Sequence, residues 1–159
     1  MNKRNQILVT LSTFGAYSNE PYNVLKKSGF AFQSNTSGKR MIPEDVLRLG
    51  QNCMGIIAGV EEYSSELLSK LPNLCCISRC GSGIDNINLT EAKKRKIVIL
   101  NTPDSPTIAV AELTLSMILS LLRQLPKVNS LMHERMWQRV SGNLLAGKVV
   151  GIIGLGRIG

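Results

Sequence analysis

From residue 6 to residue 100, short apolar runs alternate with amphipathic stretches, and no other feature of the sequence restricts the fold as strongly. Short apolar runs bounded by Gly, Pro, Asn or charged residues are typical of buried parallel strands, and the stretches between them are typical of connecting helices. The chain is therefore predicted to be an α/β protein. Its predicted strands are residues 6–11, 31–33, 55–58, 74–78 and 97–100.

Helix start and stop signals lie between these runs. A Ser-Gly pair, a proline at a first helical position and two candidate serine caps mark the ends of the helices. The predicted helices are residues 19–27, residues 43–49, and a third that Ser64 or Ser65 caps and that finishes before Pro72.

After the fifth run the pattern changes to one long apolar stripe at helical spacing, over residues 107–125. This stripe predicts a long, buried helix of about five turns, which Pro126 closes. Glu112 and Arg123 interrupt the apolar residues, so the helix is predicted not to span a membrane. A second helix is predicted over residues 128–139.

A turn-forming Thr-Pro-Asp-Ser-Pro segment, residues 102–106, separates the strand and helix units from the long helix. We therefore predict one domain over residues 1–104 and the beginning of another over residues 105–159. Residues 148–153 are predicted to be the buried first strand of that second domain.

The formal net charge of +8 could attract nucleic acid, an anionic membrane or a small anionic substrate. The densest basic run, residues 93–96, precedes an apolar strand and is typical of the solvated last turn of a helix. No aromatic residues interleave with it. The basic run is therefore predicted to be a solvated helix end, and neither nucleic acid nor a membrane is predicted as a partner.

The amino terminus and the cysteines indicate in which cellular compartment the protein is expected. The apolar run that follows residues 1–6 is too short for a signal peptide, so a cytoplasmic protein is predicted. The four cysteines, Cys53, Cys75, Cys76 and Cys80, show neither zinc spacing nor a disulfide framework. They are predicted to be buried free thiols, and no metal site is predicted.

Residues 154–159 (Gly-Leu-Gly-Arg-Ile-Gly) match the G-x-G-x-x-G pattern and directly follow the predicted strand at 148–153. In a dinucleotide site Gly154 would allow the tight turn and Gly156 the approach of backbone N–H groups to a pyrophosphate. Gly159 would let a following helix pack on the strand. A glycine turn without a ligand is the alternative.

A second glycine-rich loop, residues 79–86, follows the fourth predicted strand. The carboxyl ends of parallel strands are where open α/β sheets bind ligands, and glycines let main-chain N–H groups point into an anion site. Arg79 would add a positive charge with a bidentate fork. The alternative is a structural turn in which Arg79 pairs with a nearby carboxylate.

Four ordered segments carry a family resemblance: residues 78–87 (Ser-Arg-Cys-Gly-Ser-Gly-Ile-Asp-Asn-Ile), 101–103 (Asn-Thr-Pro), 110–113 (Val-Ala-Glu-Leu) and 154–159. In order and spacing they resemble the D-isomer-specific 2-hydroxyacid dehydrogenases, especially the branch that acts on 3-phosphoglycerate. The resemblance implies a flavodoxin-like parallel-sheet substrate domain over residues 1–104. An interdomain helix and the first strand of a truncated Rossmann domain would follow over residues 105–159.

The resemblance also implies roles for individual residues. Ser82 and Gly83 would supply N–H groups to the substrate carboxylate, and Arg79 would lie near the distal anionic group. The implied cofactor is NAD, with NADP left open, and the implied cofactor-binding residues are Gly154, Gly156, Arg157, Ile158 and Gly159. The implied substrate is a small anionic 2-hydroxy or 2-oxo acid, and the implied assembly is a homodimer or a higher oligomer.

Hydride transfer in this family uses an Arg, a His and a Glu, all of which follow the glycine pattern. No catalytic residue is therefore expected in residues 1–159, and this chain alone is expected to be inactive. His133 matches none of the family's catalytic positions and is predicted to be a surface histidine.

One departure concerns the substrate. The 3-phosphoglycerate branch often has an Arg-Ser pair after the third strand, where this sequence reads Ala-Gly-Val-Glu-Glu at residues 58–62. The missing cation and the two carboxylates, Glu61 and Glu62, oppose a phosphorylated substrate. The alternative function is a dinucleotide-sensing, corepressor-like binding protein of the same fold.

Overall fold

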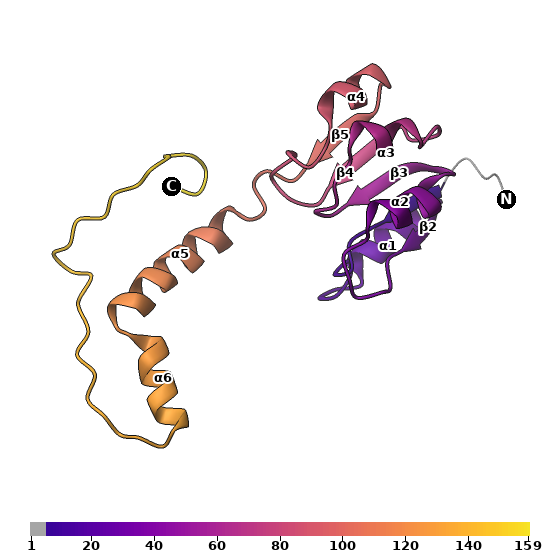
Figure 1. The fold of residues 1–159 in the computed structure, drawn as a ribbon. Helices are drawn as coiled ribbons and strands as arrows, with labels where there is room; N and C mark the ends of the chain where they lie inside the picture. Colours follow the sequence, from indigo (N-terminus) through magenta and orange to yellow (C-terminus); the bar gives the residue numbers. More distant parts are fainter. Residues whose placement is uncertain (1–5) are drawn as a thin grey trace. The chain divides into compact units, whose positions relative to one another are not determined.

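The computed structural model describes residues 6–159, which fall into two units (Figure 1). The first unit ends at Pro103 and the second is Asp104–Gly159, so the division lies next to the predicted boundary at residue 104. Residues 1–5, on which the prediction of a cytoplasmic protein partly rests, lie outside the described residues.

The first unit is built on a parallel sheet whose strand order is β2-β1-β3-β4-β5. This is the 2-1-3-4-5 order of flavodoxin-like folds, which confirms the predicted class. The strands are β1 (Gln6–Val9), β2 (Ala31–Ser34), β3 (Cys53–Ala58), β4 (Cys76–Arg79) and β5 (Val98–Asn101). The helices are α1 (Glu20–Lys27), α2 (Pro43–Gly50), α3 (Ser65–Ser69) and α4 (Leu89–Lys94).

One face of the sheet forms the main core. Register aligns Ile56 of β3 with Ile77 of β4, and both side chains are buried beneath α2, α3 and α4. Val46 and Leu68, from the first two of these helices, are fully buried in the same cluster. On the opposite face, Tyr22 of α1 packs against Phe32 of β2, which extends the core to the β2 edge of the sheet.

Short polar signals set the helix ends. Ser64 caps α3 by accepting from the Leu67 N–H, as predicted, and Asn88 caps α4 by accepting from the Glu91 N–H. Lys93 and Lys94 lie exposed in the last turn of α4, so the solvated basic helix end is confirmed.

The second unit begins with α5 (Thr107–Leu122), which is followed by α6 (Leu125–His133). The prediction that Pro126 closes the long helix is wrong. The break comes at Gln124, whose left-handed conformation (φ 53°) interrupts the helical hydrogen bonds. Pro126 instead lies in the first turn of α6, where its missing N–H costs no hydrogen bond.

The predicted burial of the long helix is also wrong, because no residue of α5 is buried. Apolar side chains lie on all sides of α5. None of them is completely buried by other residues of the second unit. Those exposed by more than a third are Ile108, Val110, Leu113, Leu115, Met117, Leu119 and Leu121. No single helix among residues 6–159 is long and apolar enough to cross a membrane, although α5 and α6, bent by 66°, pass that test jointly.

The remainder of the second unit, after α6, contains no helix or strand. The helix predicted over residues 128–139 ends early, and Trp137 is 92% exposed. The strand predicted over residues 148–153 is not formed either. A strand needs a hydrogen-bonding neighbour, and none of the described residues of this unit provides one.

The cysteines differ from the prediction of four buried thiols. All four are free, but only Cys53 is buried, whereas Cys75 and Cys80 are exposed. Burial raises the pKa of the Cys53 thiol.

Candidate functional site

Parallel register brings the predicted ligand loop to one edge of the sheet. Ala58, Arg79 and Asn101, the last residues of β3, β4 and β5, lie side by side in the sheet. The loop of residues 80–86 begins at this edge, directly after Arg79. The structure therefore places Arg79, Ser82 and Gly83 together at the carboxyl ends of the strands, where open α/β sheets bind ligands.

The end of β5 fixes one side of this loop. The Gly81 N–H donates to Thr102 Oγ1 at 2.8 Å, and the Thr102 N–H donates back to the Gly81 carbonyl at 3.0 Å. Asn101 Nδ2 donates to the Ser82 carbonyl at 2.8 Å. Among residues 6–159, the Ser82 and Gly83 N–H groups have no acceptor, and both residues are exposed. Two adjacent free N–H groups suit an anion such as a carboxylate.

Arg79 lies against its own loop. Its guanidinium donates to the Cys80 carbonyl and covers Gly81, so that a Cβ at position 81 would clash with it. Arg79 Nε is buried without a hydrogen-bond partner, and no carboxylate among the described residues forms an ion pair with it. The close contact, together with the positive φ of 146°, explains why position 81 is glycine.

Glu61, whose carboxyl group is buried, fixes the other side of the loop through its backbone carbonyl. Glu61 is only 2% exposed, and its Oε2 accepts from Thr10 Oγ1 at 2.8 Å and from the Gly59 N–H at 2.9 Å. Asn86, at the end of the loop, donates through Nδ2 to the Glu61 carbonyl at 2.6 Å. The expectation that both carboxylates oppose a ligand is therefore wrong for Glu61, which faces inward. Glu62 is exposed.

Tyr63 joins the loop to the segment that follows β3 through its backbone. Its N–H donates to the Asn86 carbonyl at 2.7 Å, and its carbonyl accepts from the Asn88 N–H at 2.9 Å. The side chain is fully buried, and its hydroxyl has no hydrogen-bond partner among the described residues. Burial raises the pKa of this hydroxyl well above its ordinary value.

The segment after β2 adds a cation that the sequence reading missed. Asn35 is buried, and its Nδ2 donates to the Thr10 carbonyl at 2.8 Å and to the Lys39 carbonyl at 2.7 Å. The next residue, Arg40, is exposed and donates through Nη2 to the Val60 carbonyl. The Arg40 guanidinium therefore places a positive charge beside residues 58–62, from the segment that follows β2.

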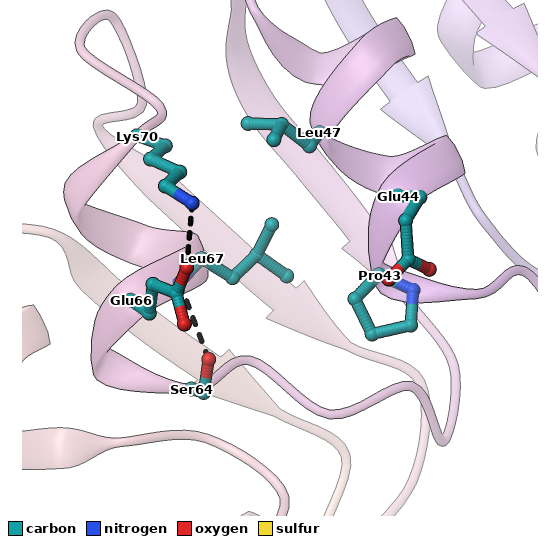
Figure 2. Close-up of a pocket in the computed structure, with 7 residues that line it drawn as sticks. All are labelled: Pro43, Glu44, Leu47, Ser64, Glu66, Leu67 and Lys70. Atoms are coloured by element: carbon teal, nitrogen blue, oxygen red, sulfur yellow. Dashed lines mark hydrogen bonds and ion pairs between the residues drawn. The ribbon is translucent and has the colours of Figure 1, made fainter.

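A hollow between α2 and α3 lies apart from the loop of residues 80–86 and from Arg40. Its volume is about 180 Å³, and its lining residues are Pro43, Glu44, Leu47, Ser64, Glu66, Leu67 and Lys70 (Figure 2). Figure 2 shows Lys70 Nζ paired with Glu66 Oε1, at 2.5 Å, on one wall. The hydrogen bond from Lys70 lowers the pKa of Glu66. None of the predicted ligand residues lines this hollow, so it is not the candidate site.

The glycine pattern forms a turn but not a complete phosphate site. Gly154 has a φ of 93°, and a Cβ at Gly159 would lie 2.5 Å from the Gly154 carbonyl oxygen. The turn therefore requires both glycines. Arg157 Nε pairs with Asp104 Oδ1 at 2.5 Å, while Gly156 and Ile158 are exposed. Within residues 6–159 no strand leads directly into this turn and no helix follows it, so the helix terminus that would hold a pyrophosphate is not formed.

The described residues contain no group of three or more His, Cys, Asp or Glu side chains able to hold a metal ion. His133 is exposed at the end of α6, as predicted, and its Nδ1 lies 2.9 Å from the Asn129 carbonyl oxygen.

Curated relatives share a substantial part of the sequence. D-3-phosphoglycerate dehydrogenase of Sus scrofa is 38% identical over 119 residues, which are 73% of this chain and 22% of that protein. D-3-phosphoglycerate dehydrogenase of Bacillus subtilis is 39% identical over 106 residues, 65% of this chain and 20% of that protein. The matched part thus spans only about a fifth of the length of these relatives.

Solved structures share the fold. A Thermus thermophilus protein superposes with a TM-score of 0.85 at 24% identity, over 96% of this chain and 50% of that one. D-lactate dehydrogenase from Aquifex aeolicus, complexed with NAD and lactic acid, gives 0.79 at 24% identity, over 97% and 45%. NADPH-dependent glyoxylate/hydroxypyruvate reductase from Sinorhizobium meliloti, in complex with NADP and malonate, gives 0.74 at 27% identity, over 98% and 47%.

The sequence also matches a protein family directly. Residues 12–151 match the family described as D-isomer specific 2-hydroxyacid dehydrogenase, catalytic domain. That range takes in the loop of residues 80–86 and most of both units. The chain therefore belongs to the D-isomer specific 2-hydroxyacid dehydrogenase family.

Proposed function

We propose that this chain is the acid-binding part of an NAD-dependent oxidoreductase that acts on the CH–OH group of a D-2-hydroxy acid. The observation that carries the proposal is the pair of free N–H groups at Ser82 and Gly83, held at the carboxyl edge of the sheet. A carboxylate can accept from both groups at once, which would fix the acid end of the substrate.

The proposed cofactor is a nicotinamide dinucleotide. The Aquifex aeolicus structure holds NAD and the Sinorhizobium meliloti structure holds NADP, which supports the class of cofactor without choosing between the two. When bound, such a dinucleotide supplies the hydride acceptor. The residues of this chain proposed to contact it are Gly154, Gly156, Arg157, Ile158 and Gly159. Their glycine turn supports this role, and the proposal further requires a helix after the turn to hold the phosphates.

The proposed substrate is a small anionic 2-hydroxy acid, with 3-phosphoglycerate as the first candidate. The names of the Sus scrofa and Bacillus subtilis relatives support that candidate. None of the relatives named above is a corepressor, so the dinucleotide-sensing alternative receives no support from them. We further propose that the enzyme works as a homodimer or a higher oligomer.

We place the catalytic Arg, His and Glu beyond the glycine pattern, so the polypeptide of residues 1–159 is proposed to bind acid without oxidising it. The test is NADH formation, followed at 340 nm, with D- and L-forms of 2-hydroxy acids. The complete product of the natural gene should oxidise a D-acid, and residues 1–159 should not. Absence of turnover by the complete product, or preference for an L-acid, would overturn the proposal.

A further inference from the structure

Arg40 is a cation with unused hydrogen-bonding capacity at the ligand edge. Its side chain is exposed, and its only partner among the described residues is the Val60 carbonyl, which Nη2 contacts. A guanidinium has five N–H donors in a planar fork, so most of them are free to meet a planar or tetrahedral anion.

The backbone that carries Arg40 is held firmly in place. Asn35 fastens the start of its segment to the end of β1 through the Thr10 carbonyl, and it also holds the Lys39 carbonyl, one residue before Arg40. Ser37 adds hydrogen bonds from its N–H and hydroxyl to Asn35 Oδ1, at 3.0 Å and 2.7 Å. Arg40 therefore projects from a fixed base, so less entropy is lost when it binds a ligand.

The same network joins Arg40 to the acid-binding loop. Val60, which Arg40 contacts, lies between Gly59 and Glu61, and Asn86 Nδ2 donates to the carbonyls of both of these residues. Asn86 ends the loop that carries Ser82 and Gly83. The Arg40 guanidinium therefore contacts the residue between the two carbonyls that hold Asn86.

The charged groups beside Arg40 differ in exposure. Glu61, the nearest carboxyl group in sequence to Val60, is buried and already accepts from Thr10 and Gly59, whereas Glu62 is exposed. Arg79, a second cation of this edge, is folded against the Cys80 carbonyl. Arg40 is therefore more available than Arg79 to a ligand that reaches beyond the loop.

We propose that Arg40 binds a second anionic group of the substrate, at the end opposite the carboxylate held by Ser82 and Gly83. The protein then prefers 2-hydroxy acids that carry a distal carboxylate or phosphate over those that end in a methyl group. This inference rests on the proposed function and assigns the choice of substrate to the segment after β2.

The test is isothermal titration of the chain of residues 1–159 with three probes: D-lactate, D-malate and 3-phospho-D-glycerate. In Arg40→Met, affinity for at least one of the two probes that carry a second anionic group should fall about tenfold or more, the scale of a lost charge-assisted contact. Affinity for D-lactate should stay within about twofold, because that probe has no second anion. The probe that loses affinity identifies the distal group as carboxylate or phosphate.

Arg48→Met is the matched control, because Arg48 is exposed in the neighbouring helix α2 but already pairs with Asp45 at 2.7 Å. It should leave all three affinities within about twofold. Equal losses in both variants, or an equal loss for all probes in Arg40→Met, would overturn the role of Arg40. Failure of the unmodified chain to bind D-lactate would instead refute the Ser82 and Gly83 site, and the inference with it.

Discussion

At Gly81 a single missing side chain makes room for the Arg79 guanidinium, and the positive φ of 146° disfavours any other residue. Gly81→Ala should therefore lower the free energy of unfolding by about 1–3 kcal/mol. It should also weaken binding of D-lactate, because the N–H groups of Ser82 and Gly83 would move. Urea unfolding and calorimetric titration measure the two effects.

Gly83→Ala is the control in the same loop. A Cβ at position 83 would meet only Asp85 Oδ2, at an ordinary 3.6 Å, and φ there is not positive. Its stability should stay within about 0.5 kcal/mol of the parent chain. Equal stability of both variants would contradict the strain expected at position 81 from its positive φ and the Arg79 contact.

Tyr63 should make stability depend on alkaline pH. Burial raises the pKa of its hydroxyl, so the folded chain holds this proton more tightly than the unfolded chain. The contribution is fully present below the unfolded pKa of about 10, and it is lost as pH rises toward the folded pKa. The free energy of unfolding should therefore fall above about pH 10.

Tyr63→Phe should reduce this alkaline loss, whereas Tyr17→Phe should not, because Tyr17 is 99% exposed. At neutral pH, Tyr63→Phe should keep stability or raise it by up to about 1 kcal/mol, since the hydroxyl has no partner. An unchanged pH profile in Tyr63→Phe would show that another group causes the alkaline loss.

Single residues of the site differ in how visible they are in the sequence. Ser82 and Gly83 stand out because glycines punctuate a loop directly after an apolar run. Glu61 and Arg40 do not, because their roles depend on contacts with residues 51 and 20 positions away, Thr10 and Val60. Nothing local distinguishes the buried Glu61 from the exposed Glu62 beside it.

At the start of α3 the local sequence and the structure agree on the helix cap. Ser64 caps α3 through a 3.2 Å hydrogen bond from the Leu67 N–H. Ser64→Ala should therefore lower the free energy of unfolding by about 1 kcal/mol. Ser65→Ala, one residue further on and exposed, should change it by less than about 0.5 kcal/mol. Similar losses in the two variants would contradict the assignment of Ser64 as the cap.

An apolar run correctly predicted a strand where a second strand of the same unit is available to pair with it. All five apolar runs of the first unit form strands because each pairs with another run, as Ile56 does with Ile77. The apolar run at residues 148–153 has the same character but no pairing partner among the described residues, and it is not a strand. The end of α5 was missed because the left-handed Gln124 carries no glycine or proline signal.

For the molecule as a whole, the apolar surface of α5 should drive self-association. Leu113 and Leu121 are 57% and 73% exposed, and contiguous apolar surface of this kind marks contact sites. Sedimentation velocity at micromolar concentration should show species larger than a monomer. Leu113→Lys combined with Leu121→Lys should shift them toward the monomer.

A second double variant, Tyr17→Lys with Thr90→Lys, adds the same charge at exposed positions of the first unit. It should leave the association unchanged. Equal dissociation by both double variants would point to net charge, and a monomeric parent chain would refute association through α5.

The loop after β4 is proposed to hold the carboxylate of a 2-hydroxy acid. A titration of the isotope-labelled chain with D-lactate, followed by amide NMR, reports on this contact at single residues. The Ser82 and Gly83 amide signals should show saturable shifts that exceed those elsewhere in the chain. Saturable shifts confined to other residues, or none at these two amides, would contradict it.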